Sequence, residues 1–234
     1  MFKPRKGCLL NILLIVAFSV SVSLATPAFS GAWLREKGTG FSSVSASAAV
    51  ARNVTQTIYL EYGVREDLTL GAEVGSTFNA NGTQSGSATV FLRRPIRAND
   101  GPNVWSYELG IGAGWTGYAI SPSSKTGLSW GRGYKINQMN GWMAVDASVL
   151  LDVYSADYSA KIDATIGLNF NGHLAGMIQI FHTENASGPA TSIAPSFVVK
   201  PLTDKPALRL QVGGETQVGR PQNVAFKISL WRDF

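Results

Sequence analysis

The segment that decides the fold class reads YSAKIDATIGLNF and runs from Tyr158 to Phe170. Apolar residues stand at every second position, and the positions between them hold only polar residues or glycine. Side chains alternate between the two faces of a β-strand, so this period of two predicts a strand with one apolar and one polar face. The segment is about twice as long as a typical strand of about five or six residues in a soluble sheet. It is long enough to cross a bilayer when tilted.

The same alternation recurs along the rest of the chain, for example from Leu68 and from Trp105. Clusters of Gly, Asn, Asp, Pro and Ser separate the segments and predict connections near 79–86, 98–103, 121–127, 185–189 and 219–223. No linker and no change of composition divides the chain after residue 30, so we expect one domain over 31–234. The predicted strands lie near 40–50, 56–65, 68–78, 87–97, 104–118, 128–138, 142–154, 158–171, 173–183, 191–202, 207–218 and 224–234.

Apolar and polar residues also alternate along the strands of a soluble β-sandwich, but two features favour a membrane barrel. Charged residues such as Glu73, Asp163 and Arg209 lie in mid-strand on the polar face, as a wet lumen behind a lipid-facing wall requires. Aromatic residues gather near strand ends, where their rings suit the membrane interfaces. We therefore expect an all-β, transmembrane, antiparallel up-and-down barrel of twelve strands, with ten as the alternative. Both termini should face the periplasm, and the longer connections should face outward. The predicted interface aromatics are Trp105, Trp115, Trp130 and Phe234.

Residues 1–30 have the layout of a secretory signal peptide. Lys3, Arg5 and Lys6 precede an apolar run over 9–25, and the small residues Ala28 and Ser30 fit a cleavage site before Gly31. The alternative is an uncleaved anchor, although 17 apolar residues are at the lower limit for a spanning helix. We expect export through the Sec pathway and cleavage before Gly31.

The composition after residue 30 excludes several classes of protein. The single cysteine, Cys8, precedes the apolar run, so the predicted mature chain has no disulfide and no thiolate metal site. Removing three bases from the 20 leaves 17 against 15 acids, which is a net charge of +2. This part of the chain has no cluster of basic residues of the kind that binds nucleic acid, so we expect no nucleic-acid partner.

The C-terminal segment alternates through Val224, Phe226, Ile228 and Leu230 and ends at Phe234. It resembles the C-terminal signature of bacterial outer-membrane β-barrel proteins, a final amphipathic strand that ends in an aromatic residue. The resemblance implies insertion into the outer membrane by the barrel-insertion machinery, with outer-membrane lipid around the wall.

Two motifs that could carry enzymatic chemistry give weak signals. Gly112, Gly114 and Gly117 have the spacing of a dinucleotide fingerprint, but they lie in an alternating strand, whereas that motif must open a helix. His173 and His182 are the only histidines, and neither lies in a serine–histidine pattern of the known outer-membrane hydrolases. We expect no cofactor, no metal ion and no enzymatic activity, with a lipid-modifying hydrolase as the minor alternative.

Charged residues on the polar face are the remaining candidates for function. The parity of each strand places Arg93 and Arg97 opposite the carboxylates of Glu73 and Glu108, so we expect at least one arginine–carboxylate pair across the lumen. The glycines at 110, 112 and 114, with those at 131 and 133, should leave a clear stripe beside them. The predicted lumen-lining set is Glu61, Glu73, Arg93, Arg97, Glu108, Lys135, Asp146, Lys161, Asp163, Arg209, Glu215 and Lys227.

Acids and bases are nearly balanced on this face, which argues against strong selectivity by charge. The sequence favours a narrow, weakly selective channel for small solutes. A closed barrel with a structural, adhesive or complex-forming role is the alternative.

Overall fold

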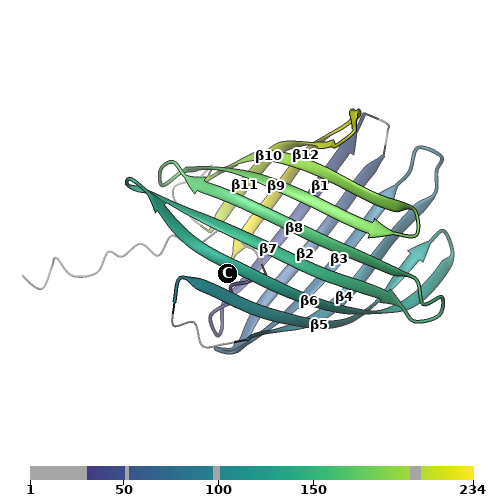
Figure 1. Ribbon diagram of the computed structural model, residues 1–234, viewed down its shortest axis with the longest axis horizontal. Helices are drawn as coiled ribbons and strands as arrows, with labels where there is room; N and C mark the ends of the chain where they lie inside the picture. Colours follow the sequence, from purple (N-terminus) through teal and green to yellow (C-terminus); the bar gives the residue numbers. More distant parts are fainter. Residues whose placement is uncertain (1–30, 51–52, 97–100, 201–206) are drawn as a thin grey trace, which may run out of the picture.

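Twelve antiparallel β-strands form one closed barrel in the computed structural model, which describes residues 31–50, 53–96, 101–200 and 207–234 (Figure 1). The predicted strand number and fold class are confirmed. Within the described ranges, no helix is both long and apolar enough to cross a membrane. The strands are β1 (Gly40–Ala49), β2 (Val54–Arg65), β3 (Leu68–Phe78), β4 (Gln84–Pro95), β5 (Asn103–Thr116), β6 (Ala119–Ile136), β7 (Met139–Asp152), β8 (Tyr158–Asn169), β9 (Leu174–Asn185), β10 (Gly188–Val199), β11 (Leu208–Gln217) and β12 (Arg220–Asp233).

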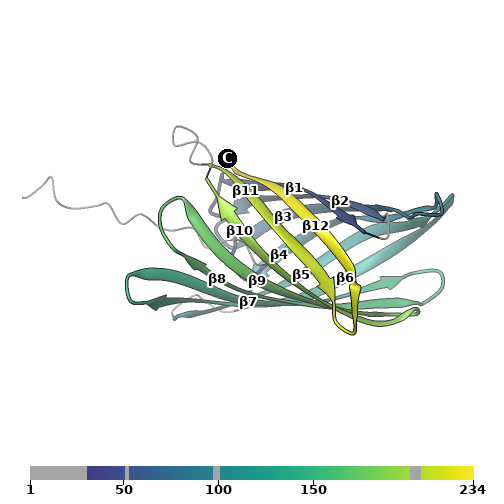
Figure 2. The ribbon, with the colours of Figure 1, turned by 90° about the horizontal axis from the view of Figure 1, so that it is seen from above.

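The last strand closes the barrel on the first. Each strand pairs with its neighbours in the chain, and β1 pairs with β12 from Phe41 opposite Asp233 to Ala49 opposite Ala225. A closed sheet leaves no unpaired edge, which is the condition for a sheet in hydrocarbon, where no water can satisfy free backbone groups. The strands that form the wall are steeply tilted, as Figure 2 shows. The start of β1 and the end of β12 lie at the same mouth of the barrel, called here the terminal mouth; the opposite end is the far mouth.

Strand β8 shows how the alternation becomes two faces. Ile162 and Ile166 are 49% and 48% exposed on the outer face. Lys161, Asp163 and Thr165, between and beside them, line an internal cavity. The outer face carries exposed apolar side chains around the whole wall, as contact with lipid requires.

Aromatic rings cover glycines on the inner face, so the expected clear stripe is only partly present. Phe91 lies over Gly71, its direct neighbour on β3, and a β-carbon on Gly71 would collide with the ring. Trp142 covers Gly167 of β8 in the same way. Because glycine has no side chain, a large ring can pack against the wall at these positions. Gly114 does remain clear, since its nearest neighbour would lie 3.8 Å from a β-carbon.

Two expectations about the connections were wrong. Residues 121–127 form part of β6, and a two-residue turn at Gly117 and Tyr118 joins β5 to β6. Pro122 misled the prediction, but pairing with β7 begins only at Ser123, so its missing N–H breaks no bond to β7. The longest connections, seven residues after Pro95 and eight after Val199, join strand ends that lie at the terminal mouth.

Candidate functional site

The barrel interior holds two adjoining cavities of about 600 and 490 Å³. Five residues line both, so the cavities form one continuous space: Ser45, Glu73, Lys161, Phe181 and Lys227. The larger cavity lies toward the far mouth, and the smaller one reaches Gly31, Phe41 and Trp231 near the terminal mouth.

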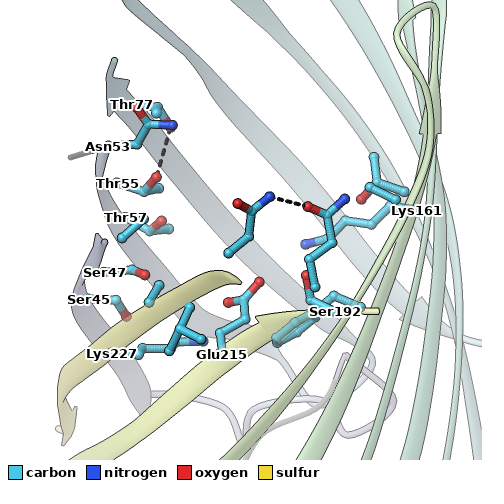
Figure 3. A pocket seen from close by; sticks show the side chains of 18 of the residues that line it. Ser45, Ser47, Asn53, Thr55, Thr57, Thr77, Lys161, Ser192, Glu215 and Lys227 are labelled. Carbon is cyan, nitrogen blue, oxygen red and sulfur yellow. Dashed lines mark hydrogen bonds between the residues drawn. The ribbon is translucent and has the colours of Figure 1, made fainter. Parts of the chain in front are cut away.

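Hydroxyl groups dominate one wall of the larger cavity. The inward positions of β1 and β2 carry small polar residues, and Figure 3 shows them facing Lys161 and Ser192 across the space (Figure 3). Thr55 and Thr77 share a hydrogen bond of 3.0 Å across the β2–β3 ladder. Small side chains leave the lumen open here, and their hydroxyls can both donate and accept. The wall consists of Ser45, Ser47, Thr55, Thr57 and Thr77.

Two lysines and an aromatic ring form the middle of the lumen. The Nζ atoms of Lys161 and Lys227 lie 5.8 and 5.1 Å from the ring centroid of Phe181, within the range of a cation–π contact. Lys161 also pairs with Asp163 at 2.8 Å. Glu215 lines the larger cavity with Lys227. Both signs of charge therefore reach the same cavity.

A buried ion-pair network lies on one wall, between β2 and β6. Arg93 binds Glu61 and also Glu108, with 2.7 Å between Nη2 and Oε2 of Glu108. Lys125 binds the other oxygen of Glu108 at 2.8 Å, and the hydroxyl of Tyr59 donates to Glu61 at 2.5 Å. The predicted arginine–carboxylate pair is present, but it runs along the wall and does not cross the lumen. Removing one partner of such a buried network typically costs about 3–5 kcal/mol.

Residues 31–39 fold into the barrel at the terminal mouth; we call them the N-terminal segment. Arg35 Nε donates to Glu61 at 2.7 Å, and its backbone N–H donates to Thr69 Oγ1 at 2.9 Å. Ala32 is fully buried, and the ring of Trp33 lies against Gly131 of β6. These contacts place the segment across the lumen beside the ion-pair network.

An apolar cluster completes the closure of the terminal mouth. Phe41 and Trp231 face each other across the β1–β12 seam, with ring centroids 6.2 Å apart. Trp33 of the N-terminal segment and Tyr59 pack against the cluster. The lumen is therefore polar and open toward the far mouth and filled at the terminal mouth. The buried members are Phe41, Trp142, Ala175, Met177, Val198 and Trp231.

Most of the predicted lumen residues line the two cavities, with three exceptions. Arg209 is buried at the terminal mouth and pairs with Asp233 at 2.5 Å. Lys135 was placed wrongly: it is exposed next to the last residue of β6, where the strand extends to the rim. Arg97 lies outside the described residues. Those that line a cavity are Glu61, Glu73, Arg93, Glu108, Asp146, Lys161, Asp163, Glu215 and Lys227.

The sequence analysis missed two cations that belong to the network. Lys125 lies in the stretch taken for a connection, although it shares the parity of Ser123 and Gly127 and could have been found from it. Arg35 precedes the first strand, where no periodicity predicts the direction of a side chain.

Trp105, Trp115 and Phe234 lie near the ends of strands, and Trp130 lies six residues before the end of β6. Trp105 and Trp130 are cross-strand partners with ring centroids 6.4 Å apart, and Phe234 is 54% exposed at the terminal mouth. Trp115 lies near the far mouth, beside Gly86 of β4. These positions agree with rings at two membrane interfaces.

The fold does not support the glycine motif or the histidines as parts of an enzymatic site. Gly112 and Gly114 lie within β5, and Gly117 forms the following turn, so no helix N-terminus faces a pyrophosphate site. His182 points to the outer face, where its Nδ1 lies 2.8 Å from the hydroxyl of Thr191. Within the described ranges, no three Asp, Glu, His or Cys residues are grouped so that they could hold a metal ion.

Solved outer-membrane barrels share this fold at very low sequence identity. The KdgM porin aligns with a TM-score of 0.58 and 10% identity over 83% of this chain and 99% of its own. The COG4313 outer membrane channel from Pseudomonas putida F1 gives 0.55 and 12% over 88% and 99%, and the NanC porin gives 0.53 and 12% over 82% and 98%. No protein-family model and no curated protein matches the sequence. At these identities the likeness establishes the fold, that of a small outer-membrane barrel.

Proposed function

We propose that the protein is a narrow, weakly selective outer-membrane channel for small hydroxyl-bearing solutes, closed at rest at the terminal mouth. The continuous polar lumen carries this proposal: two connected cavities lined by serines and threonines run from the far mouth to the N-terminal segment.

The likeness to solved porins supports the same class of function. The KdgM porin has been solved in complex with disordered oligogalacturonate, a chain of sugar acids. The lumen of this protein carries hydroxyls and both signs of charge, so a small sugar or a similar polar solute fits it chemically. We propose no catalytic role, since the described residues that line the two cavities include no histidine or cysteine.

The proposals on export and topology are based on the sequence. Residues 1–30 lie outside the described residues, and we propose that they are a signal peptide removed before Gly31. The single domain over 31–234 would then enter the outer membrane with the terminal mouth toward the periplasm. The periplasmic mouth would be the closed one.

Bilayer conductance tests the channel and its closure together. The mature protein should give small, infrequent current steps with a reversal potential near zero. The double variant Trp33→Ala/Arg35→Ala removes the ring and the ion pair that hold the N-terminal segment, so its conductance should rise severalfold. Lys37→Ala changes an exposed residue of the same segment and should leave the conductance unchanged.

A closed barrel is the second candidate, because the apolar cluster fills the terminal mouth beside the N-terminal segment. Its signature would be the absence of current from the wild type and from the double variant, while both proteins refold. Swelling of liposomes in neutral sugar solutions gives an independent measure, since it reports solute passage without an applied voltage.

A further inference from the structure

Gly31 lies deep in the lumen, over three neighbouring strands. Its carbonyl oxygen accepts a hydrogen bond of 2.6 Å from Ser106 of β5. A β-carbon built on Gly31 would lie 2.7 Å from Ser129 Oγ of β6, 2.7 Å from Asp146 Oδ1 of β7 and 3.1 Å from Arg93 Nη2 of β4. Ser106 pairs with Ser129, and Ser129 pairs with Asp146, so these three side chains form one row beneath Gly31.

The backbone nitrogen of Gly31 must lie close to the carboxylate of Asp146. In any residue the nitrogen is about 2.5 Å from the β-carbon position, because both are bonded to the same tetrahedral Cα. The nitrogen of Gly31 is therefore within about 5 Å of Asp146 Oδ1. Opposite charges at about 4–6 Å interact strongly where water is scarce.

Asp146 needs a cation that the barrel wall does not supply. Its Oδ1 atom is shielded from solvent and has no hydrogen-bond partner among the described residues. Its cross-strand neighbour on β8 is another acid, Asp163, which is paired with Lys161. The nearby Arg93 is already held by Glu61 and Glu108. Like charges directly opposite each other destabilise a sheet, so an additional positive group beside Asp146 is favoured.

The charges of the whole lumen point to the same missing group. Six carboxylates line the cavities, and five cations lie among or beside them, so the carboxylates exceed the cations by one. One further positive charge in the lumen would make the interior neutral. The carboxylates are Glu61, Glu73, Glu108, Asp146, Asp163 and Glu215, and the cations are Arg35, bound to Glu61, with Arg93, Lys125, Lys161 and Lys227.

We infer that the missing charge is the α-ammonium group of Gly31, created by signal-peptide cleavage, and that it anchors the N-terminal segment to Asp146. In the precursor the nitrogen of Gly31 is a neutral amide joined to Ser30. Hydrolysis of this bond consumes one water and leaves a carboxylate on Ser30 and an ammonium on Gly31. Processing therefore supplies the counterion inside the barrel. The inference rests on cleavage before Gly31 and is independent of solute passage.

A double-mutant cycle tests the pair in the mature protein. Mass spectrometry first establishes that the chain begins at Gly31. Transamination of the unfolded protein then replaces the α-ammonium with a neutral carbonyl, and Asp146→Asn removes the carboxylate charge. Each change alone should lower the equilibrium constant for folding, measured by urea titration in detergent, by roughly tenfold. The two together should cost little more than one, because they break the same interaction.

Glu215→Gln serves as the matched control, since Glu215 lines the cavity toward the far mouth. Its effect should add fully to that of transamination. A second measurement uses the wild type alone: the α-amine should react with an amine-selective aldehyde far more slowly in the folded protein than in urea. This measurement holds even where Asp146→Asn fails to fold.

Two results of these measurements would overturn the inference: additive effects of transamination and Asp146→Asn, or equal reactivity of the amine in folded and unfolded protein. A mature chain that begins elsewhere than Gly31 would overturn it as well. Neither readout measures current, so failure here leaves the channel proposal standing, and a non-conducting barrel leaves this pair standing.

Discussion

An arginine at Ile166 tests whether the outer face of β8 contacts lipid. Ile166 is 48% exposed on the outer face, and its cross-strand neighbours are Met143 and Ile178. The adjacent residue Thr165 points the other way and lines the smaller cavity. Ile166→Arg and Thr165→Arg therefore place the same charge one residue apart on opposite sides of the wall.

The depth of Ile166 sets the size of the effect. The outward positions of this segment run from Tyr158 to Phe170, two aromatic residues suited to opposite interfaces. Twelve steps of about 3.3 Å at a tilt of about 40° span roughly 30 Å, the thickness of the hydrocarbon core. Ala164 is the midpoint, and Ile166 lies about 5 Å from it by the same geometry. Arginine at this depth should cost about 2–3 kcal/mol.

Urea titration of the protein refolded in phospholipid vesicles measures the free energy of unfolding. Thr165→Arg should cost less than about 1 kcal/mol, because its charge enters a wet lumen. Leu168→Arg, about 10 Å from the midpoint, should cost about 1 kcal/mol. If Thr165→Arg costs as much as Ile166→Arg, or if depth makes no difference, the assignment of the two faces is wrong.

Two further predictions concern the interior. Glu108→Gln removes the carboxylate shared by Arg93 and Lys125, so it should destabilise the barrel by about 3 kcal/mol in the same titration. It should also shift the reversal potential toward anions. An unchanged reversal potential would mean that this network lies outside the ion path. Gly131→Ala places a methyl group 2.6 Å from the ring of Trp33, so it should loosen the N-terminal segment and raise the conductance. Gly133→Ala is the control and should leave the conductance unchanged, because the nearest neighbour of its methyl group lies 4.0 Å away. Equal conductance of the two variants would refute this role of the segment.

The faces of the strands could be predicted from the sequence because the backbone itself fixes them. Successive side chains of a strand point to opposite sides whatever surrounds them. Asp163 and Lys161 could therefore be assigned to the lumen from parity alone, and the structure places both against a cavity. The same rule fails near the end of a strand: Lys135 keeps its parity but is exposed next to the last residue of β6.

Strand ends and partners depend on contacts that periodicity does not contain. The segment around Lys125 is rich in Ser, Pro and Gly, residues typical of turns, yet pairing with the flanking strands extends β6 through it. Parity also could not predict that Phe91 covers Gly71, because that contact depends on which strands become neighbours. The position of Arg35 depends on the path of a segment with no repeating structure.

The distribution of side-chain size along the inner face indicates where the channel must open. On β1 the inward residues change from Phe41 near the terminal mouth to Ser45 and Ser47 near the far mouth. A barrel wall cannot widen without breaking its ladder of hydrogen bonds, and a closed sheet has no free edge at which to begin. The N-terminal segment is held by side-chain contacts and a few hydrogen bonds, so its displacement costs far less than any change in the wall. Opening therefore requires movement of the segment that follows Gly31, and the charge at its end sets how firmly the mouth is closed.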